Sequence, residues 1–187
     1  MKKARKATKK ITRVGVLDFE TYLEGGIHVP YMAGFQLEGG QPILVRGNVA
    51  QALLQRIFEE IPTHKGKTRQ VTTLYAHNLA KFDGHFLLGE LGDFKITPLF
   101  KNETTILQME ITSNSRPDIK LVLRDSNLVI PGSLSKLAKT FGCETQKGQF
   151  PYKFVTKDTL AYVGDKPAIN FYEGISIEEY SKIKSTG

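Results

Sequence analysis

Apolar residues occur along this chain in short segments that have the periods of strands and helices. The run Val14–Leu17 is continuously apolar, which predicts a buried parallel strand, and Val71–Ala76 predicts a second strand. A helix is predicted between them, because five apolar residues recur on one helical face: Ala50, Leu53, Leu54, Ile57 and Ile61. Asn48 is its expected N-cap and Pro62 its stop. This alternation of strands and helices predicts an α/β fold.

The other apolar segments extend this pattern without an internal repeat or a low-complexity stretch. Strands are predicted at Val29–Leu37, Pro42–Val45, Ile96–Phe100, Thr105–Ile111 and Lys120–Leu123. The first two are expected to form an antiparallel meander around a Gly-Gly turn. Helices are predicted from the second polar motif to about Leu91, from Ser133 to Phe141, and from starts at Thr156 and Ser176. This order is compatible with a ribonuclease H-like mixed sheet flanked by helices.

Two polar motifs follow the two predicted parallel strands and lie about sixty residues apart. Asp18 and Glu20 come at the end of the first strand, where side chains two apart point to one side while Phe19 points into the core. Asn78 and Asp83 come just after the second strand. Ligand sites in open α/β sheets lie beyond the carboxyl ends of the strands. The three carboxylates are therefore expected to converge on one crevice.

Carboxylate oxygens without His or Cys partners suit Mg²⁺ or Mn²⁺. Two such ions, about 3.5 to 4 Å apart, can activate a water and stabilise the leaving 3′ oxygen of a phosphodiester. A lone Asp-x-Glu after a strand is more often a solvated strand end. The segment His77–Phe86 strengthens the nuclease interpretation, because an Asn in a turn, an Asp five residues on and an adjacent Gly describe a tight corner facing a ligand.

On these motifs, the chain from about Arg13 to Lys184 resembles the family B DNA polymerases that use protein priming, found in certain phages and in linear plasmids of fungal and plant mitochondria. Those enzymes begin with a 3′→5′ proofreading exonuclease of the DEDD type. Asp18-x-Glu20-Thr21 resembles its first motif, and His77-Asn78 through Asp83 resembles its second. Two further stretches resemble segments of the same family: Arg124–Lys139 and Lys147–Phe154.

The resemblance implies a role for each of these positions. The implied metal ligands and catalytic carboxylates are Asp18, Glu20 and Asp83, and Lys147 is implied to aid catalysis. The implied DNA-binding residues are Thr21, Asn78, Phe86, Ser126 and Tyr152. Phe86 also has a structural interpretation, because its spacing from Phe82 is that of a helical core position. Asn127 stands where some members have Leu, which weakens the carry-over for the neighbouring Ser126.

The resemblance also implies a fold, a cofactor and partners. The implied fold is a ribonuclease H-like DEDD exonuclease fold, and the implied cofactor is a pair of Mg²⁺ or Mn²⁺ ions. The implied partners are the 3′ end of single-stranded DNA and a terminal priming protein. A plasmid-type gene of this family implies a mitochondrial location.

The resembled nuclease class has a third motif, Tyr-x-x-x-Asp or His-x-x-x-x-Asp, which this chain lacks. Lys184 stands four residues after Tyr180, and no His follows His85. We therefore expect a fold and a two-metal site that are incomplete at the C-terminus, in an N-terminal piece of a longer polymerase. Two alternatives stay open: a catalytically inactive module that binds single-stranded DNA or the terminal protein, and a stand-alone oligoribonuclease-type enzyme. The Lys147–Phe154 stretch disfavours the latter.

Composition is compatible with one nuclease-sized domain, expected over residues 13–187. The chain has 187 residues, of which 40% are hydrophobic, enough for one sizeable core. The formal net charge is +7, and residues 1–12 contain a basic run that is expected to be a disordered arm attracted to nucleic-acid phosphates. The single cysteine, Cys143, excludes an internal disulfide, and no zinc site is expected. No apolar run approaches eighteen residues, so no membrane span is predicted.

Overall fold

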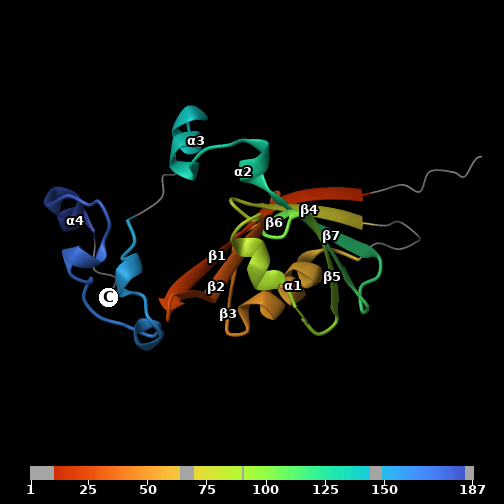
Figure 1. The fold of residues 1–187 in the computed structure, drawn as a ribbon, viewed down its shortest axis with the longest axis horizontal. Coiled ribbons are helices and arrows are strands. Elements are labelled where there is room, and N and C mark those ends of the chain that lie inside the picture. Colours follow the sequence, from red (N-terminus) through yellow and green to blue (C-terminus); the bar gives the residue numbers. More distant parts are fainter. Residues whose placement is uncertain (1–10, 64–69, 90, 144–148, 184–187) are drawn as a thin grey trace, which may run out of the picture. The chain divides into compact units, whose positions relative to one another are not determined.

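A seven-stranded mixed sheet forms the centre of the fold (Figure 1). The computed structural model describes residues 11–63, 70–89, 91–143 and 149–183. The strands are β1 (Ile11–Glu24), β2 (Ile27–Leu37), β3 (Ile43–Arg46), β4 (Gln70–Ala76), β5 (Phe94–Asn102), β6 (Thr105–Ser113) and β7 (Ile119–Asp125). Their order in the sheet is β3-β2-β1-β4-β7-β6-β5.

The centre of the sheet is parallel and both edges are antiparallel. β4 pairs in parallel with β1 on one side and with β7 on the other. β2 with β3, β5 with β6, and β6 with β7 pair antiparallel. The predicted mixed α/β class, the parallel strand at Val14–Leu17 and the β2–β3 meander are therefore confirmed.

Helices and single turns connect and follow the strands. The α-helices are α1 (Val49–Glu60), α2 (Ser126–Val129), α3 (Leu134–Thr140) and α4 (Ile177–Lys182). The 3₁₀ turns are η1 (Asp83–Leu87), η2 (Tyr152–Phe154), η3 (Lys157–Thr159) and η4 (Ile169–Phe171). The predicted caps are confirmed at Ser133, whose hydroxyl accepts from the Lys136 amide, and at Thr156 and Ser176, which form capping boxes. Asn48 precedes α1 as predicted, but its side chain donates to Gln51 Oε1 and does not accept a capping hydrogen bond from the helix.

The chain divides into two compact units. The sheet unit comprises the described residues up to Phe19 together with Met32–Gly132, and the second unit comprises Glu20–Tyr31 together with the described residues from Ser133 onward. One domain was predicted over residues 13–187. The division falls inside β1 and β2, because these strands continue beyond the sheet into a hairpin that belongs to the second unit.

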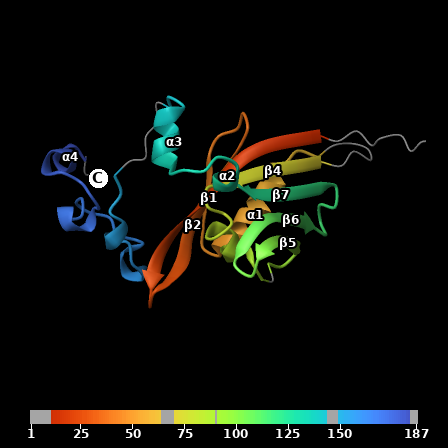
Figure 2. The ribbon, with the colours of Figure 1, turned by 45° about the horizontal axis from the view of Figure 1, so that its top comes forward.

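The core of the sheet unit lies between the sheet and α1, which runs along one face of the sheet (Figure 2). The apolar face of α1 is buried as predicted, with Leu53, Leu54 and Ile57 at 0% exposure. Each such side chain contributes about 1.5 to 3 kcal/mol of hydrophobic free energy. The sheet supplies the facing side chains, including Leu17, Phe19, Leu74, Leu121 and Leu123.

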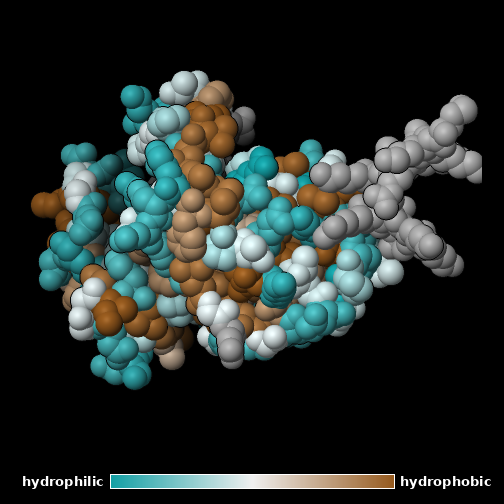
Figure 3. All heavy atoms as spheres, turned by 45° about the vertical axis from the view of Figure 1, so that its right-hand side comes forward, coloured by the Kyte–Doolittle hydropathy of each residue, from teal (hydrophilic) through white to brown (hydrophobic). Residues whose placement is uncertain are grey.

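Burial along β1 alternates, although the continuous apolar run predicted burial on both faces. Leu17 and Phe19 lie in the core, whereas Val14 and Val16 are 45% and 54% exposed. The reason is that α1 covers one face only, so the valines reach the surface of the opposite face. Figure 3 shows hydrophobic residues, in brown, lying among polar ones at the molecular surface.

Two predicted boundaries differ from the structure. β1 begins at Ile11 rather than after residue 12, because Ile11 and Thr12 pair with Gln70 and Val71 of β4. The remainder of the predicted arm lies outside the described residues. The helix expected to reach about Leu91 is the single turn η1, and the chain is extended at Leu88 before Gly89 adopts a φ of +130°. No described helix is long and apolar enough to cross a membrane.

Candidate metal site at the carboxyl ends of the central strands

Asp18 and Asp83 lie close to each other at the carboxyl end of the parallel strands. Asp18 is a surface residue of β1, preceding the core residue Phe19. Asp83 opens η1 and is only 2% exposed. The Phe19 backbone amide lowers the pKa of Asp83, so Asp83 of the second motif lies beside the strand that carries the first motif. The predicted convergence of these two carboxylates is therefore present in the sheet unit.

The environment of Asp83 favours its protonated form. The pKa of Asp83 is raised from 3.8 to about 7. The largest cause is burial, and the second is the negative charge of Asp18. Hydrogen bonds from the backbone of Asp83 and Phe19 oppose this shift, and the more remote Asp125 adds a smaller upward contribution. A buried carboxyl group whose pKa is raised beside a second carboxylate is a candidate functional site, and the two carboxyl groups together offer oxygen ligands for a cation.

A hydrogen-bond deficit at Asp83 fits a divalent ion. Among the described residues, Asp83 Oδ1 is buried and has no hydrogen-bond partner. A buried oxygen without a partner costs free energy, and a cation would supply the missing interaction. Asp83 and Asp18 offer oxygen donors only, which suits Mg²⁺ or Mn²⁺. In the described part of the chain no group of three or more His, Cys, Asp or Glu side chains forms a metal site.

The other residues of the first motif lie further along β1, in the second unit. Glu20 follows Asp18 by two positions on the same strand, so strand geometry directs both side chains to the same side. Thr21 Oγ1 lies 2.9 Å from His28 Nδ1, across the β1–β2 hairpin. The metal role of Glu20 and the DNA role of Thr21 stay predictions.

The turn of the second motif has an unusual backbone. Asn78 has a φ of +73°, the only described non-glycine residue in the left-handed region. Asn tolerates this region better than most residues do. The Asn78 carbonyl accepts from the Lys81 and Phe82 amides at 3.2 and 3.0 Å. A Cβ on Gly84 would lie 2.8 Å from the Leu79 carbonyl oxygen, so only glycine fits directly after Asp83.

A residue that sequence reasoning missed, Asp125, holds this turn. It ends β7, is 2% exposed, and accepts the Asn78 amide on Oδ1 at 3.0 Å and the Ala80 amide on Oδ2 at 2.9 Å. Its position carried a signal, because β7 is the third parallel strand and Asp125 stands at its carboxyl end, much as Asp18 follows the stretch of β1 that pairs with β4.

Ser126 begins α2 beside the same turn. Its Oγ lies 3.1 Å from His77 Nδ1 and donates to the Ala76 carbonyl at 3.3 Å. The structure therefore brings Ser126, His77 and Asn78 together at the ends of β4 and β7, two of them predicted DNA-binding residues. Their DNA contacts stay predictions.

The remaining predicted site residues have different surroundings. Phe86 is half-buried, with its ring centroid 5.4 Å from that of Phe19 and 5.1 Å from that of Phe82, so it packs against the core. Tyr152 belongs to the second unit, is 38% exposed, and meets the Phe150 ring edge-on at 5.0 Å. Lys147 lies outside the described residues.

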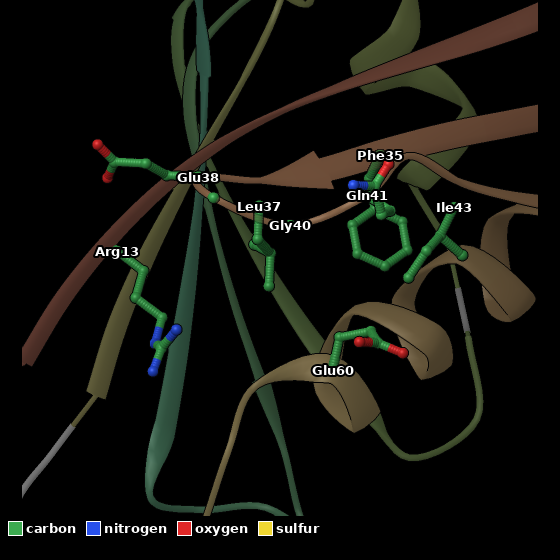
Figure 4. Close-up of a pocket in the computed structure, with 9 residues that line it drawn as sticks. Arg13, Phe35, Leu37, Glu38, Gly40, Gln41, Ile43 and Glu60 are labelled. Carbon is green, nitrogen blue, oxygen red and sulfur yellow. The ribbon is translucent and has the colours of Figure 1, made fainter.

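A hollow of about 300 Å³ lies at the amino end of β1 in the sheet unit (Figure 4). Arg13, Glu38 and Glu60 line it together with Phe35, Leu37 and other residues of the β2–β3 hairpin. It contains none of the predicted site residues, which lie at the carboxyl ends of the parallel strands.

Comparison with known proteins identifies the family. A model of the family described as "DNA polymerase type B, organellar and viral" matches residues 67–187. A "Probable DNA polymerase" of Agaricus bitorquis is 35% identical over 190 residues, covering 92% of this chain and 24% of that protein. A "Probable DNA polymerase" of Neurospora intermedia is 33% identical over 121 residues, covering 58% of this chain and 12% of that protein.

Solved structures share the fold. Phi29 DNA polymerase complexed with primer-template DNA superposes with a TM-score of 0.58 at 19% identity, covering 93% of this chain and 29% of that chain. The same polymerase complexed with single-stranded DNA gives a TM-score of 0.56 at 18% identity, with 92% and 29% coverage. The fold is that of a mixed α/β protein with a seven-stranded sheet. The chain belongs to the organellar and viral type B DNA polymerases, and it spans about a quarter of the length of the Agaricus relative.

Proposed function

We propose that this chain is the 3′→5′ exonuclease region of a protein-primed type B DNA polymerase. In this role it removes nucleotides from the 3′ end of single-stranded DNA during replication, with Mg²⁺ or Mn²⁺ ions. Family membership supports the polymerase context. The single observation that carries the nuclease proposal is the buried, unpartnered Oδ1 of Asp83 beside the charge of Asp18.

Asp18, Glu20 and Asp83 are the proposed cation ligands. A bound divalent ion would supply charge neutralisation and an acidified water for phosphodiester hydrolysis. The residues contribute positioning: the Phe19 amide favours the ionised form of Asp83, and Gly84 lets the backbone turn tightly after it. Burial of Asp83 in a nearly dry environment strengthens its attraction for a cation.

The proposed strand contacts lie around this centre and in the second unit. Asn78 and Ser126 present polar groups at the ends of β4 and β7, and Thr21, Phe86 and Tyr152 are proposed to bind the strand by hydrogen bonding or stacking. Lys147 is proposed to steady charge on the reacting phosphate. A terminal priming protein is a further proposed partner.

We place this function in a mitochondrion, on a gene of linear-plasmid type. The family description names organellar and viral polymerases, and the relatives come from fungi. The chain covers 24% of the length of the Agaricus bitorquis polymerase, which supports a role as one region of a larger enzyme.

One observation favours the alternative of a binding module that does not cut. The described residues form no group of three metal-ligating side chains, whereas a two-metal reaction needs a full carboxylate set. In that case the chain would hold single-stranded DNA or the terminal protein through the Asn78 turn and Ser126 without hydrolysing it.

The test is release of a 3′ label from single-stranded DNA in Mn²⁺. Wild-type protein is compared with Asp18→Ala, which removes one proposed ligand, and with Asp165→Ala, which removes an exposed carboxylate of the second unit. We expect release by the wild type and by Asp165→Ala, and none by Asp18→Ala. The activity has to be lost in EDTA.

Two other results would count against the exonuclease function. Equal release by all three proteins would identify a contaminating nuclease and reject the proposal. Strand binding without release by the wild type would support the binding module.

A further inference from the structure

One buried carboxylate connects two of the segments that carry proposed DNA contacts in the sheet unit. Asp125 accepts the amides of Asn78, Ala80 and Asn127, the last on Oδ1 at 2.7 Å. Hydrogen bonds from backbone N–H groups to an ionised acceptor are roughly twice as strong as neutral ones. Two of these hydrogen bonds come from the Asn78 turn and one from the start of α2, so they fix the positions of these two segments relative to each other.

The Asn78 turn needs an acceptor of this shape. The β4 ladder ends at Ala76 and Asn78 then adopts a left-handed φ, so the amides of Asn78 and Ala80 lie beyond the sheet pairing and need another acceptor. Buried N–H groups without an acceptor cost free energy. The two oxygens of the Asp125 carboxylate accept these two amides, which lie two residues apart, one on each oxygen.

Further hydrogen bonds within the turn connect the residues held by Asp125 to Asp83. The Asn78 carbonyl accepts the Phe82 amide at 3.0 Å, directly before Asp83. The Ala80 carbonyl accepts the Ile106 amide at 3.0 Å, which fastens the turn to β6. A displacement of Asn78 and Ala80 would therefore move the carboxylate at the candidate metal site.

The other end of the connection is Ser126. Asp125 caps α2 through the Asn127 amide, and Ser126 is the first residue of that helix. Its hydroxyl lies 3.1 Å from His77 Nδ1, one residue before Asn78. Two residues proposed to contact DNA, Asn78 and Ser126, are thus set by one side chain.

We propose that Asp125 is a positioning residue for single-stranded DNA. It touches no nucleotide itself, and it holds the Asn78 turn and the start of α2 in the arrangement that receives the strand. This inference rests on the proposed function and names the residue on which the geometry of that site depends.

The experiment compares Asp125→Asn with a matched control, Asp118→Asn. Asp118 precedes the same strand at its other end and accepts hydrogen bonds from Arg116 at 3.1 Å and Gln70 at 3.2 Å. Both substitutions remove a charge and turn one acceptor into a donor. Affinity for a fluorescent oligothymidine is measured in Ca²⁺, and amide hydrogen exchange is measured at Asn78, Ala80 and Leu74 in the same samples.

We expect Asp125→Asn to weaken oligothymidine binding about tenfold, the equivalent of one charge-assisted hydrogen bond. Exchange should accelerate at Asn78 and Ala80, while Leu74 in the core of β4 stays protected. Asp118→Asn should lower the thermal midpoint yet leave binding within about twofold, because it lies at the far end of the strand. If Asp125→Asn does not fold, Asp125→Glu keeps the charge, moves the oxygens by a methylene and should show the same loss.

The inference and the proposed function fail in different ways. Wild-type protein without affinity for oligothymidine would reject the proposed function, and the inference with it. Wild-type affinity in Asp125→Asn, or an equal loss in Asp118→Asn, would overturn the inference alone, since Asp125 would then have no role or only a general structural one.

Discussion

The sheet unit and the second unit hold their side chains by different means. In the sheet unit, more than a dozen apolar side chains from α1 and the strands are buried in one core. In the second unit, the buried hydrophobic residues within the described ranges are Tyr22 and Tyr172. Its order comes instead from capping boxes and edge-on aromatic pairs, such as Phe154 with Tyr162 and with Phe171.

This difference indicates where precise geometry can be sustained. A packed core fixes Phe19 and Leu74, and through them the strand ends that carry Asp18 and the Asn78 turn. Local caps and ring contacts are worth about 1 kcal/mol each and open independently of the core. The sheet unit is therefore suited to a metal site, and the second unit to contacts that adapt to a ligand.

The largest expected effect is on the core beneath β4. Leu74 is fully buried, so Leu74→Ala should lower the free energy of unfolding by about 3 kcal/mol through a lost transfer term and a cavity. Val163→Ala in the second unit, at 87% exposure, should change it by less than about 0.5 kcal/mol. Urea denaturation measures both, and similar values for the two variants would remove the distinction between the units.

The next effect is a dependence of stability on pH that originates at Asp83. The folded protein keeps a proton on this carboxyl up to about pH 7, whereas the unfolded chain releases it near the ordinary pKa of 3.8. Between these values the folded state binds more protons, so stability falls as pH rises and the cost is complete above about pH 7. We expect the free energy of unfolding to fall by about 2 kcal/mol across this window, because the effective dielectric constant of a protein interior weakens the cost of burying a charge.

Thermal unfolding in EDTA from pH 4 to pH 8 checks this effect. Asp83→Asn should flatten the profile and be the more stable protein at pH 8. A wild-type profile that rises over the same range would contradict the raised pKa.

A smaller effect concerns the backbone of Asn78. Its φ of +73° suits glycine and is tolerated by asparagine, so Asn78→Ala should destabilise the sheet unit by about 1 kcal/mol more than Asn78→Gly. Urea midpoints of the two variants measure the difference. Equal midpoints would mean that the turn relaxes to a right-handed conformation when the asparagine is removed.

The smallest effect is expected at the cap of α4 in the second unit. The Ser176 hydroxyl accepts a hydrogen bond from the Glu179 amide at 3.1 Å, and the Glu179 carboxylate accepts one from the Ser176 amide at 2.9 Å. Ser176→Ala should loosen α4 by about 0.5 to 1 kcal/mol and accelerate amide exchange at Glu179 and Tyr180. The global urea midpoint should not move, and a shift of that midpoint would show that the two units unfold together.

Features that depend on neighbouring residues, such as helix caps and the side to which a strand residue points, were predictable from the sequence. Which faces of the sheet are covered by other elements was not. The caps at Ser133, Thr156 and Ser176 were predicted because a cap depends on residues within one turn. The inward side chain of Phe19 followed from the period of a strand. The exposure of Val14 and Val16 was missed, because an apolar run does not tell whether one face or both will be covered.

The candidate site shows the same limit. The pairing of Asp18 with Asp83 followed from two motifs that end neighbouring strands. The role of Asp125 depends on hydrogen bonds to residues more than forty positions away, which no local pattern encodes. The helix expected after Asp83 shortens to one turn because the backbone at Gly89 leaves the helical region.

The alternation along β1 makes this strand intolerant of any change in length. A Cβ on Gly15 would lie 2.4 Å from the Gln36 carbonyl oxygen, so a one-residue deletion that brought a valine to this position would collide with β2. The same one-residue shift would turn the Phe19 side chain to the exposed face of the sheet and the Asp18 side chain to the core face. Insertions at the Gly25-Gly26 hairpin would leave that frame untouched, so natural length variation in this segment is expected at the hairpin tip and not between Ile11 and Asp18.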